Sequence, residues 1–74
     1  MNHEYDQAIG ANIRTIRLSR GMSQEQLAAK LQLLGADITR SALAKIEVGQ
    51  RHLYPDEISA LKTALSVSYD SLFV

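Results

Sequence analysis

A short segment near the middle of the chain, residues 40–51, carries side chains that can contact nucleic-acid bases. Arg40 and Lys45 can donate hydrogen bonds to guanine O6 and N7. Ser41 can donate or accept, and Ala44 can contact a thymine methyl group. The same four residues can also form an ordinary solvated helix face, so the residue types alone leave both interpretations open.

Four further polar residues lie where they can hold a phosphate. Gln24 falls in the first turn of an expected helix, where free backbone N–H groups and the helix dipole favour an anion. It can equally be a solvent-exposed residue at a helix start. Thr39 can add a phosphate contact, although helix capping alone explains it. Gln50 and Arg51 lie at the end of this segment and can hold the nucleic-acid backbone beyond the four base-contacting residues, whereas His52 is as readily explained as a surface residue.

The sequence contains no motif typical of an enzyme active site or a metal site. The two histidines, His3 and His52, lie far apart, and the chain has no cysteine, so neither zinc-ligand spacing nor a disulfide framework is present. No serine lies beside a histidine in a nucleophile arrangement, and no glycine-rich loop suits a cofactor phosphate. We expect no enzyme, no metal and no cofactor.

Charge is distributed unevenly along this neutral chain of 74 residues. Residues 13–52 hold seven basic and three acidic side chains, and the remaining acidic residues lie toward the ends. A locally basic face suits modest affinity for nucleic acid.

No apolar run approaches the roughly 20 residues of a membrane span, and the N-terminus lacks the order of a signal peptide. We therefore expect a cytoplasmic location.

The elements that must position these residues are all predicted to be helices, because no alternating run of strand formers appears. The first runs from about Asp6 to Ser19, and Gly21 stops it. The others are expected at about 24–33, at about 40–48 and from Pro55 onward, followed by a short one after Ser68. Ser23 with Gln26 forms a capping-box pattern, and Thr39 and Ser68 are typical N-cap residues. Apolar residues at helical spacing, expected to face inward, are Ile9, Ile13, Ile16, Leu27, Ala28, Leu31, Leu43, Ile46, Ile58, Leu61 and Leu65.

The sequence contains, in order, Ile9-Gly10, Ile13-Arg14, Arg17 four residues before Gly21, Ser23-Gln24-Glu25, Leu27-Ala28, Ile46-Glu47 with Gly49, and Ala64-Leu65 with Val67 and Leu72. Taken in this order, the motifs resemble the Cro-type (XRE) helix-turn-helix family of phage repressors and small bacterial regulators. The resemblance covers about residues 9–72 of a chain that we interpret as one domain, 1–74. It implies an all-α, compact five-helix, lambda-repressor-like fold in which the second and third helices form the helix-turn-helix. The segment 32–38 is longer than the tight turn of the lambdoid repressors.

The resemblance also assigns roles to single residues. It makes Arg40, Ser41, Ala44 and Lys45 the base-reading positions, and it implies that Gln24 grips a phosphate and can brace a base-reading side chain. Arg17 and Glu47 correspond to a partly buried ion pair that ties the first helix to the third, a structural role. By their residue type, Tyr54 and Tyr69 are expected to be packing residues with hydrated hydroxyl groups.

The sequence therefore predicts a transcriptional regulator, a repressor or controller, that reads operator DNA in the major groove as a homodimer. The dimer surface is expected from the last two helices, with Leu72, Phe73 and Val74 as apolar contacts. No separate effector domain is expected, although the DNA-binding half of a larger regulator would look the same. The alternative is a protein-interaction module with this fold, such as an antitoxin that binds a protein partner, and the zero net charge favours it.

Overall fold

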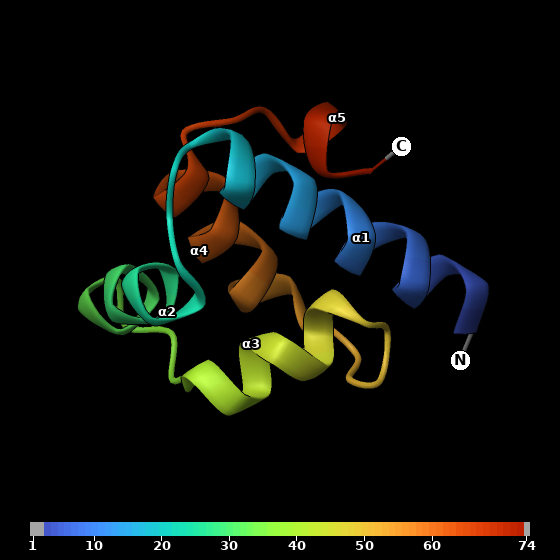
Figure 1. The fold of residues 1–74 in the computed structure, drawn as a ribbon, viewed down its shortest axis with the longest axis horizontal. Helices are drawn as coiled ribbons and strands as arrows, with labels where there is room; N and C mark the ends of the chain where they lie inside the picture. The colour runs from blue at the N-terminus through green and yellow to red at the C-terminus, as the bar shows by residue number, and fades with distance from the viewer. Residues whose placement is uncertain (1–2, 74) are drawn as a thin grey trace.

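The computed structural model describes residues 3–73, which fold into α-helices joined by short connections without any strand (Figure 1). The bounds of the helices are α1 His3–Ser19, α2 Gln24–Leu33, α3 Arg40–Glu47, α4 Pro55–Leu65 and α5 Tyr69–Leu72. The predicted all-α class and the five-helix order are confirmed. None of these helices is both long and apolar enough to span a membrane.

A side chain caps the N-terminus of α2 and of α3. The Ser23 hydroxyl accepts from the backbone N–H of Gln26 at 3.0 Å, and the Gln26 side chain accepts in return from the Ser23 N–H at 2.8 Å. At α3 the Thr39 hydroxyl accepts from the N–H of Ala42 at 3.1 Å. These bonds fix the residues at which α2 and α3 begin, because they satisfy N–H groups that have no partner within the helix.

Two predicted boundaries differ from the structure. α1 begins at His3 instead of about Asp6, since Glu4 and Asp6 place two carboxylates in a first turn that the helix dipole favours. α3 ends at Glu47, one residue before the predicted end at Val48. The cause is Gly49, whose φ of +78° turns the chain so that the N–H of Gln50 reaches the carbonyl of Lys45 at 2.8 Å.

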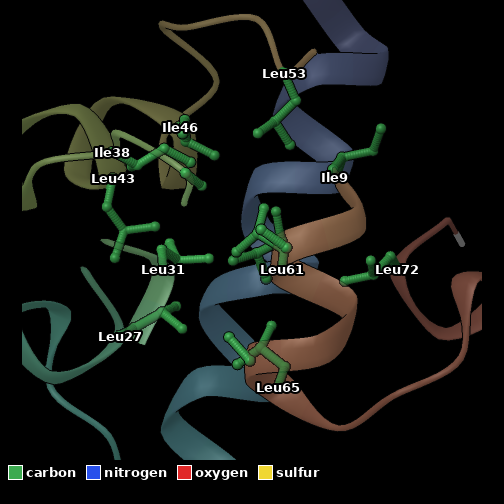
Figure 2. Packing of buried hydrophobic residues seen from close by; sticks show 14 residues of the cluster. Ile9, Leu27, Leu31, Ile38, Leu43, Ile46, Leu53, Leu61, Leu65 and Leu72 are labelled. Atoms are coloured by element: carbon green, nitrogen blue, oxygen red, sulfur yellow. The ribbon is translucent and has the colours of Figure 1, made fainter. Parts of the chain in front are cut away.

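The core is a cluster of aliphatic side chains contributed by all five helices and their connections (Figure 2). The predicted inward-facing residues are buried, apart from Ile16 and Ile58, which are partly buried at its edge. Ile38 and Leu53 join the core from the segments before and after α3, so α3 is held from both ends. α3 thus packs firmly against α1 and α2.

α1 and α3 approach one another closely at Gly10. A Cβ atom at this buried position would overlap the carbonyl oxygen of Ile46 and press on the backbone of Glu47. Only a residue without a side chain fits here, because the obstacle is backbone.

The C-terminal helix is tied to α1 through Asn12, whose side-chain amide donates to the carbonyls of Ser71 and Leu72. Leu72 is only 1% exposed, so its expected role as a dimer contact is wrong: it belongs to the core. Phe73 is partly buried and stacks on Tyr5, and Val74 lies outside the described residues.

The two tyrosines expected to pack are largely exposed, Tyr54 at 56% and Tyr69 at 45%. Tyr54 meets the ring of His52 edge-on, and the ammonium group of Lys62 lies over the ring of Tyr69. Their contacts are therefore with surface neighbours, since aliphatic side chains already fill the core.

Candidate nucleic-acid interface

The outer face of α3 carries the residues that the sequence singled out for base contact. Leu43 and Ile46 point into the core, with exposures of 0% and 1%. The helical period then turns the intervening residues outward. Arg40, Ser41 and Lys45 are exposed and Ala44 is partly exposed, so all of them share the surface of one eight-residue helix.

Arg40 has an acidic neighbour from the preceding helix. Its Nε lies 3.8 Å from the Oε1 of Glu25, and the two side chains are 63% and 78% exposed. An ion pair so exposed contributes little to stability, so the guanidinium can leave Glu25 for another acceptor. Sequence reasoning did not identify this contact, because Glu25 and Arg40 belong to different helices and no spacing rule joins them.

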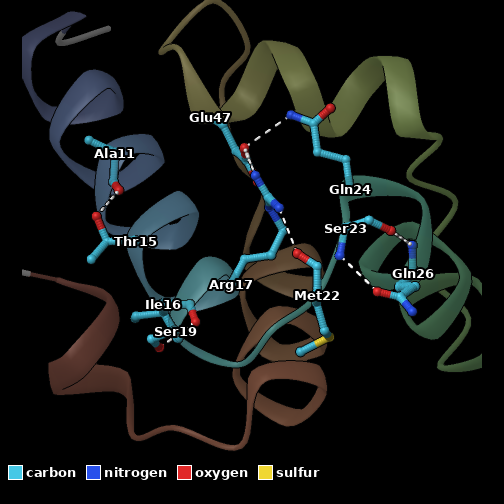
Figure 3. A network of polar contacts seen from close by, with 10 residues as sticks. All are labelled: Ala11, Thr15, Ile16, Arg17, Ser19, Met22, Ser23, Gln24, Gln26 and Glu47. Atoms are coloured by element: carbon cyan, nitrogen blue, oxygen red, sulfur yellow. Dashed lines mark hydrogen bonds and ion pairs between the residues drawn. The ribbon is translucent and has the colours of Figure 1, made fainter.

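Gln24, the first residue of α2, turns its side chain toward the end of α3. Its Nε2 donates to the Oε1 of Glu47 at 3.1 Å, and the residue is partly buried (Figure 3). This contact places the Gln24 amide between the start of one helix of the helix-turn-helix and the end of the other.

Beneath Gln24 lies a buried ion pair between α1 and α3. The Nε of Arg17 donates to Glu47 Oε2 at 2.7 Å and its Nη2 donates to Oε1 at 3.0 Å. The side chains of Arg17 and Glu47 are 7% and 1% exposed. Arg17 Nη1 donates in addition to the carbonyl of Met22 at 2.7 Å, so one guanidinium joins α1, the turn before α2 and the end of α3 (Figure 3).

Arg51, predicted to hold the DNA backbone, is engaged by a carboxylate of α4. Its Nη1 and Nη2 donate to the two oxygens of Glu57 at 2.9 and 2.8 Å, and Nη1 also donates to the carbonyl of His52. The hydrogen bonds from Arg51 lower the pKa of Glu57, and those to Glu57 raise the pKa of Arg51. The Arg51 side chain keeps 27% of its surface exposed, so a phosphate contact would have to share the guanidinium with Glu57.

Glu57 also stabilises the start of α4, because its Oε1 accepts from the N–H of Tyr54 at 3.1 Å. The pairing of Glu57 with Arg51 crosses a connection and a helix boundary, and a pattern of helical spacing does not detect such a contact.

The other two predicted backbone contacts flank α3. Thr39 is exposed and its hydroxyl caps the helix, and Gln50 is exposed just beyond the helix end. Both therefore lie at the ends of the surface formed by Arg40, Ser41, Ala44 and Lys45. We use the term α3 face for the surface of Arg40, Ser41, Ala44 and Lys45 together with four residues around the helix: Gln24, Thr39, Gln50 and Arg51.

Comparisons with known proteins agree with this geometry. Residues 13–72 match the family model described as Helix-turn-helix. Among solved structures, the restriction-modification controller protein C.AhdI from Aeromonas hydrophila is similar, with a TM-score of 0.84 and 32% sequence identity over 96% of each chain. A comparison with curated proteins finds no match.

The family match spans most of the chain and includes both helices of the helix-turn-helix. Members of this family are DNA-binding transcription factors and not enzymes. The chain belongs to the Cro-type (XRE) helix-turn-helix family of DNA-binding proteins.

Proposed function

We propose that this protein is a sequence-specific transcriptional regulator, a repressor or controller, that reads operator DNA by setting α3 into the major groove. The observation that carries the proposal is the α3 face. Exposed Arg40, Ser41 and Lys45 stand on a helix whose opposite side is fully buried. Such a helix can present donors to base edges without giving up packing.

The phosphate contacts are assigned to Gln24 at the start of α2, to Thr39 and Gln50 on either side of α3, and to Arg51 in the connection that follows. Contacts of this kind position a protein on DNA without specifying sequence. The proposal therefore divides the α3 face into base-reading residues on the helix and backbone-holding residues at its margins.

The regulator acts as a homodimer in the cytoplasm. A helix of eight residues reads a short half-site, and a two-fold dimer on a palindrome doubles the contact. A groove with a volume of ≈ 330 Å³ supports this proposal, since it lies beside α4 and the end of α5 and is largely apolar. Its lining includes Tyr5, Leu53, Ile58 and Phe73.

The kinship with a restriction-modification controller protein makes control of neighbouring genes the first function to test. Gel-shift titration of the protein against the DNA upstream of its own gene is the direct experiment. We expect a specific complex that survives excess unrelated DNA. Binding that unrelated DNA removes equally well would contradict sequence-specific regulation.

The alternative, a protein-interaction module, is favoured by one surface observation. Leu33 is 88% exposed and its neighbour Leu34 is 47% exposed, in a chain with no net charge. Exposed leucines of this kind occur where proteins contact partners. The gel shift separates the two functions, because a module used only for protein binding leaves the upstream DNA unshifted.

A further inference from the structure

We propose that Glu47 is a positioning residue for DNA recognition: its carboxylate, clamped by Arg17, orients the side-chain amide of Gln24 for contact with DNA. This inference rests on the proposed function and adds a role for a buried residue that cannot touch DNA itself. The pair of Arg17 and Glu47 then serves recognition in addition to holding α1 against α3.

Glu47 is fixed before it contacts Gln24. Both of its oxygens accept from Arg17, and its side chain is 1% exposed. Arg17 is held in turn by the carbonyl of Met22. A carboxylate with hydrogen bonds on both oxygens in a packed site cannot rotate freely. Its Oε1 is therefore a hydrogen-bond acceptor at a fixed position.

The hydrogen bond from Gln24 to this oxygen gives the Gln24 amide a defined orientation. The two ends of its amide differ, because the nitrogen donates and the oxygen only accepts. Only the nitrogen can bond to a carboxylate, so the contact with Glu47 decides which way the amide faces. Figure 3 shows the nitrogen of Gln24 toward Glu47 and the oxygen pointing away from it.

The contact leaves groups of Gln24 for DNA. One N–H is used by Glu47, whereas the second N–H and the oxygen stay available at a partly buried position at the start of α2. A phosphate accepts hydrogen bonds, so the second N–H is the matching donor. Fixing the amide in advance spares the ordering cost that a freely rotating glutamine would incur on binding.

The contact with Gln24 is not needed to hold the Glu47 carboxylate in place. Arg17 alone occupies both oxygens of Glu47 with two parallel hydrogen bonds. The bond to Gln24 is therefore additional, and it extends from the core toward the surface on which DNA is proposed to lie.

A double-mutant cycle on operator affinity tests the proposal. Arg17→Met with Glu47→Leu removes the brace without leaving a buried charge unpaired, and Gln24→Ala is then measured in this background and in the original chain. We expect the background alone to weaken operator binding about twofold to tenfold per half-site, the cost of ordering one side chain. The loss caused by Gln24→Ala should be clearly smaller in the background than in the original chain.

Three outcomes would overturn the inference and each has a separate meaning. An equal loss from Gln24→Ala in both backgrounds means that Gln24 contacts DNA without help from Glu47. If Gln24→Ala has no effect on operator binding by the original chain, Gln24 is not a contact, although the regulator itself stands. Failure of the original chain to bind any operator removes the proposed function and the inference with it.

Side-chain NMR of the unmutated protein tests the brace without relying on a variant that folds. Gln26 is the matched control, because it lies on the same helix and its side chain accepts from the Ser23 N–H through the amide oxygen, not the NH₂ group. We expect the side-chain NH₂ group of Gln24 to be more rigid than that of Gln26 on the nanosecond timescale. Equal mobility of the two NH₂ groups would show that Glu47 does not position Gln24.

Discussion

Arg51 and Glu57 face one another across the start of α4, with both terminal nitrogens of the guanidinium bonded to the carboxylate at 2.9 and 2.8 Å. The pair joins the connection after α3 to the first turn of α4. A phosphate that approaches Arg51 meets a cation whose charge is already partly balanced. The proposed contribution of Arg51 to DNA binding can therefore be separated from its contribution to the fold by changing each partner in turn.

Arg51→Ala should weaken binding to all DNA sequences similarly and reduce the slope of log affinity against log salt by about one unit, as expected when one phosphate contact is lost. Glu57→Gln is the matched control, because it breaks the same ion pair but keeps the cation. Its salt slope should be no smaller than that of the original chain. Titrations at several salt concentrations give both slopes, and an unchanged slope in Arg51→Ala would make Arg51 a residue of the connection only.

The low pKa of Glu57 predicts how stability depends on pH. Arg51 holds that pKa below its ordinary value of 4.5, so the ionised group stabilises the folded state. The stabilisation is fully present above pH 4.5 and is lost as the pH falls through the lower, folded pKa. Glu57→Gln should therefore be less stable than the original chain near pH 7, with a difference that narrows in acid.

Asp56→Asn is the control for the pH experiment, since Asp56 lies beside Glu57 in the first turn of α4 and is exposed. It removes a similar charge near the helix start without touching Arg51. Urea unfolding at several pH values measures both variants. A loss in Glu57→Gln that is the same at every pH would contradict the ion-pair explanation.

Arg17→Met should lower the free energy of unfolding by about 3–5 kcal/mol, because it leaves Glu47 buried without its partner. Adding Glu47→Leu should recover much of that loss, since an apolar pair of similar size no longer buries a charge. Denaturant titration of the two variants measures their free energies of unfolding. If Arg17→Met alone is as stable as the original chain, the ion pair contributes little.

Arg40→Ala tests base reading by the α3 face. If Arg40 contacts a guanine in each half-site, the change should cost about 1–3 kcal/mol per contacted base and relax the preference at that position alone. Selection of binding sites from random DNA measures this directly. Identical preferences before and after the change would move base reading to Ser41 and Lys45.

Glu25→Gln is a useful companion to Arg40→Ala. The pair of Glu25 and Arg40 is exposed and 3.8 Å apart, so its loss should leave stability nearly unchanged. The base preferred at the Arg40 position should also stay the same. A changed preference would show that Glu25 takes part in reading the base.

The helices could be predicted from the sequence because residues close to each helix start determine where the helix begins. Ser23 with Gln26, Thr39 and Pro55 act within one helical turn, and the apolar spacing between them fixes which side is buried. The start of α1 was placed too late because Glu4 offers a favourable charge and not a distinct cap.

Contacts between distant residues were harder to predict. Composition and periodicity do not reveal that Gln24 reaches Glu47, or that Arg51 turns to Glu57, since each contact depends on how two elements pack. Leu72 was misplaced for the related reason that an apolar residue near a chain end suits a core and a dimer surface equally. In the structure Leu72 is buried, and Asn12 donates to the carbonyls of α5 beside it.

The close approach at Gly10 limits how DNA preference can change over generations. With the backbones of α1 and α3 in direct contact, the axis of α3 cannot be tilted by enlarging a residue beneath it without damaging the fold. Under the proposed base reading by α3, new operator preferences arise by exchange of exposed side chains, such as Arg40 and Lys45, on an axis that stays fixed. Related regulators that share this glycine should therefore diverge in target sequence while superposing closely in structure.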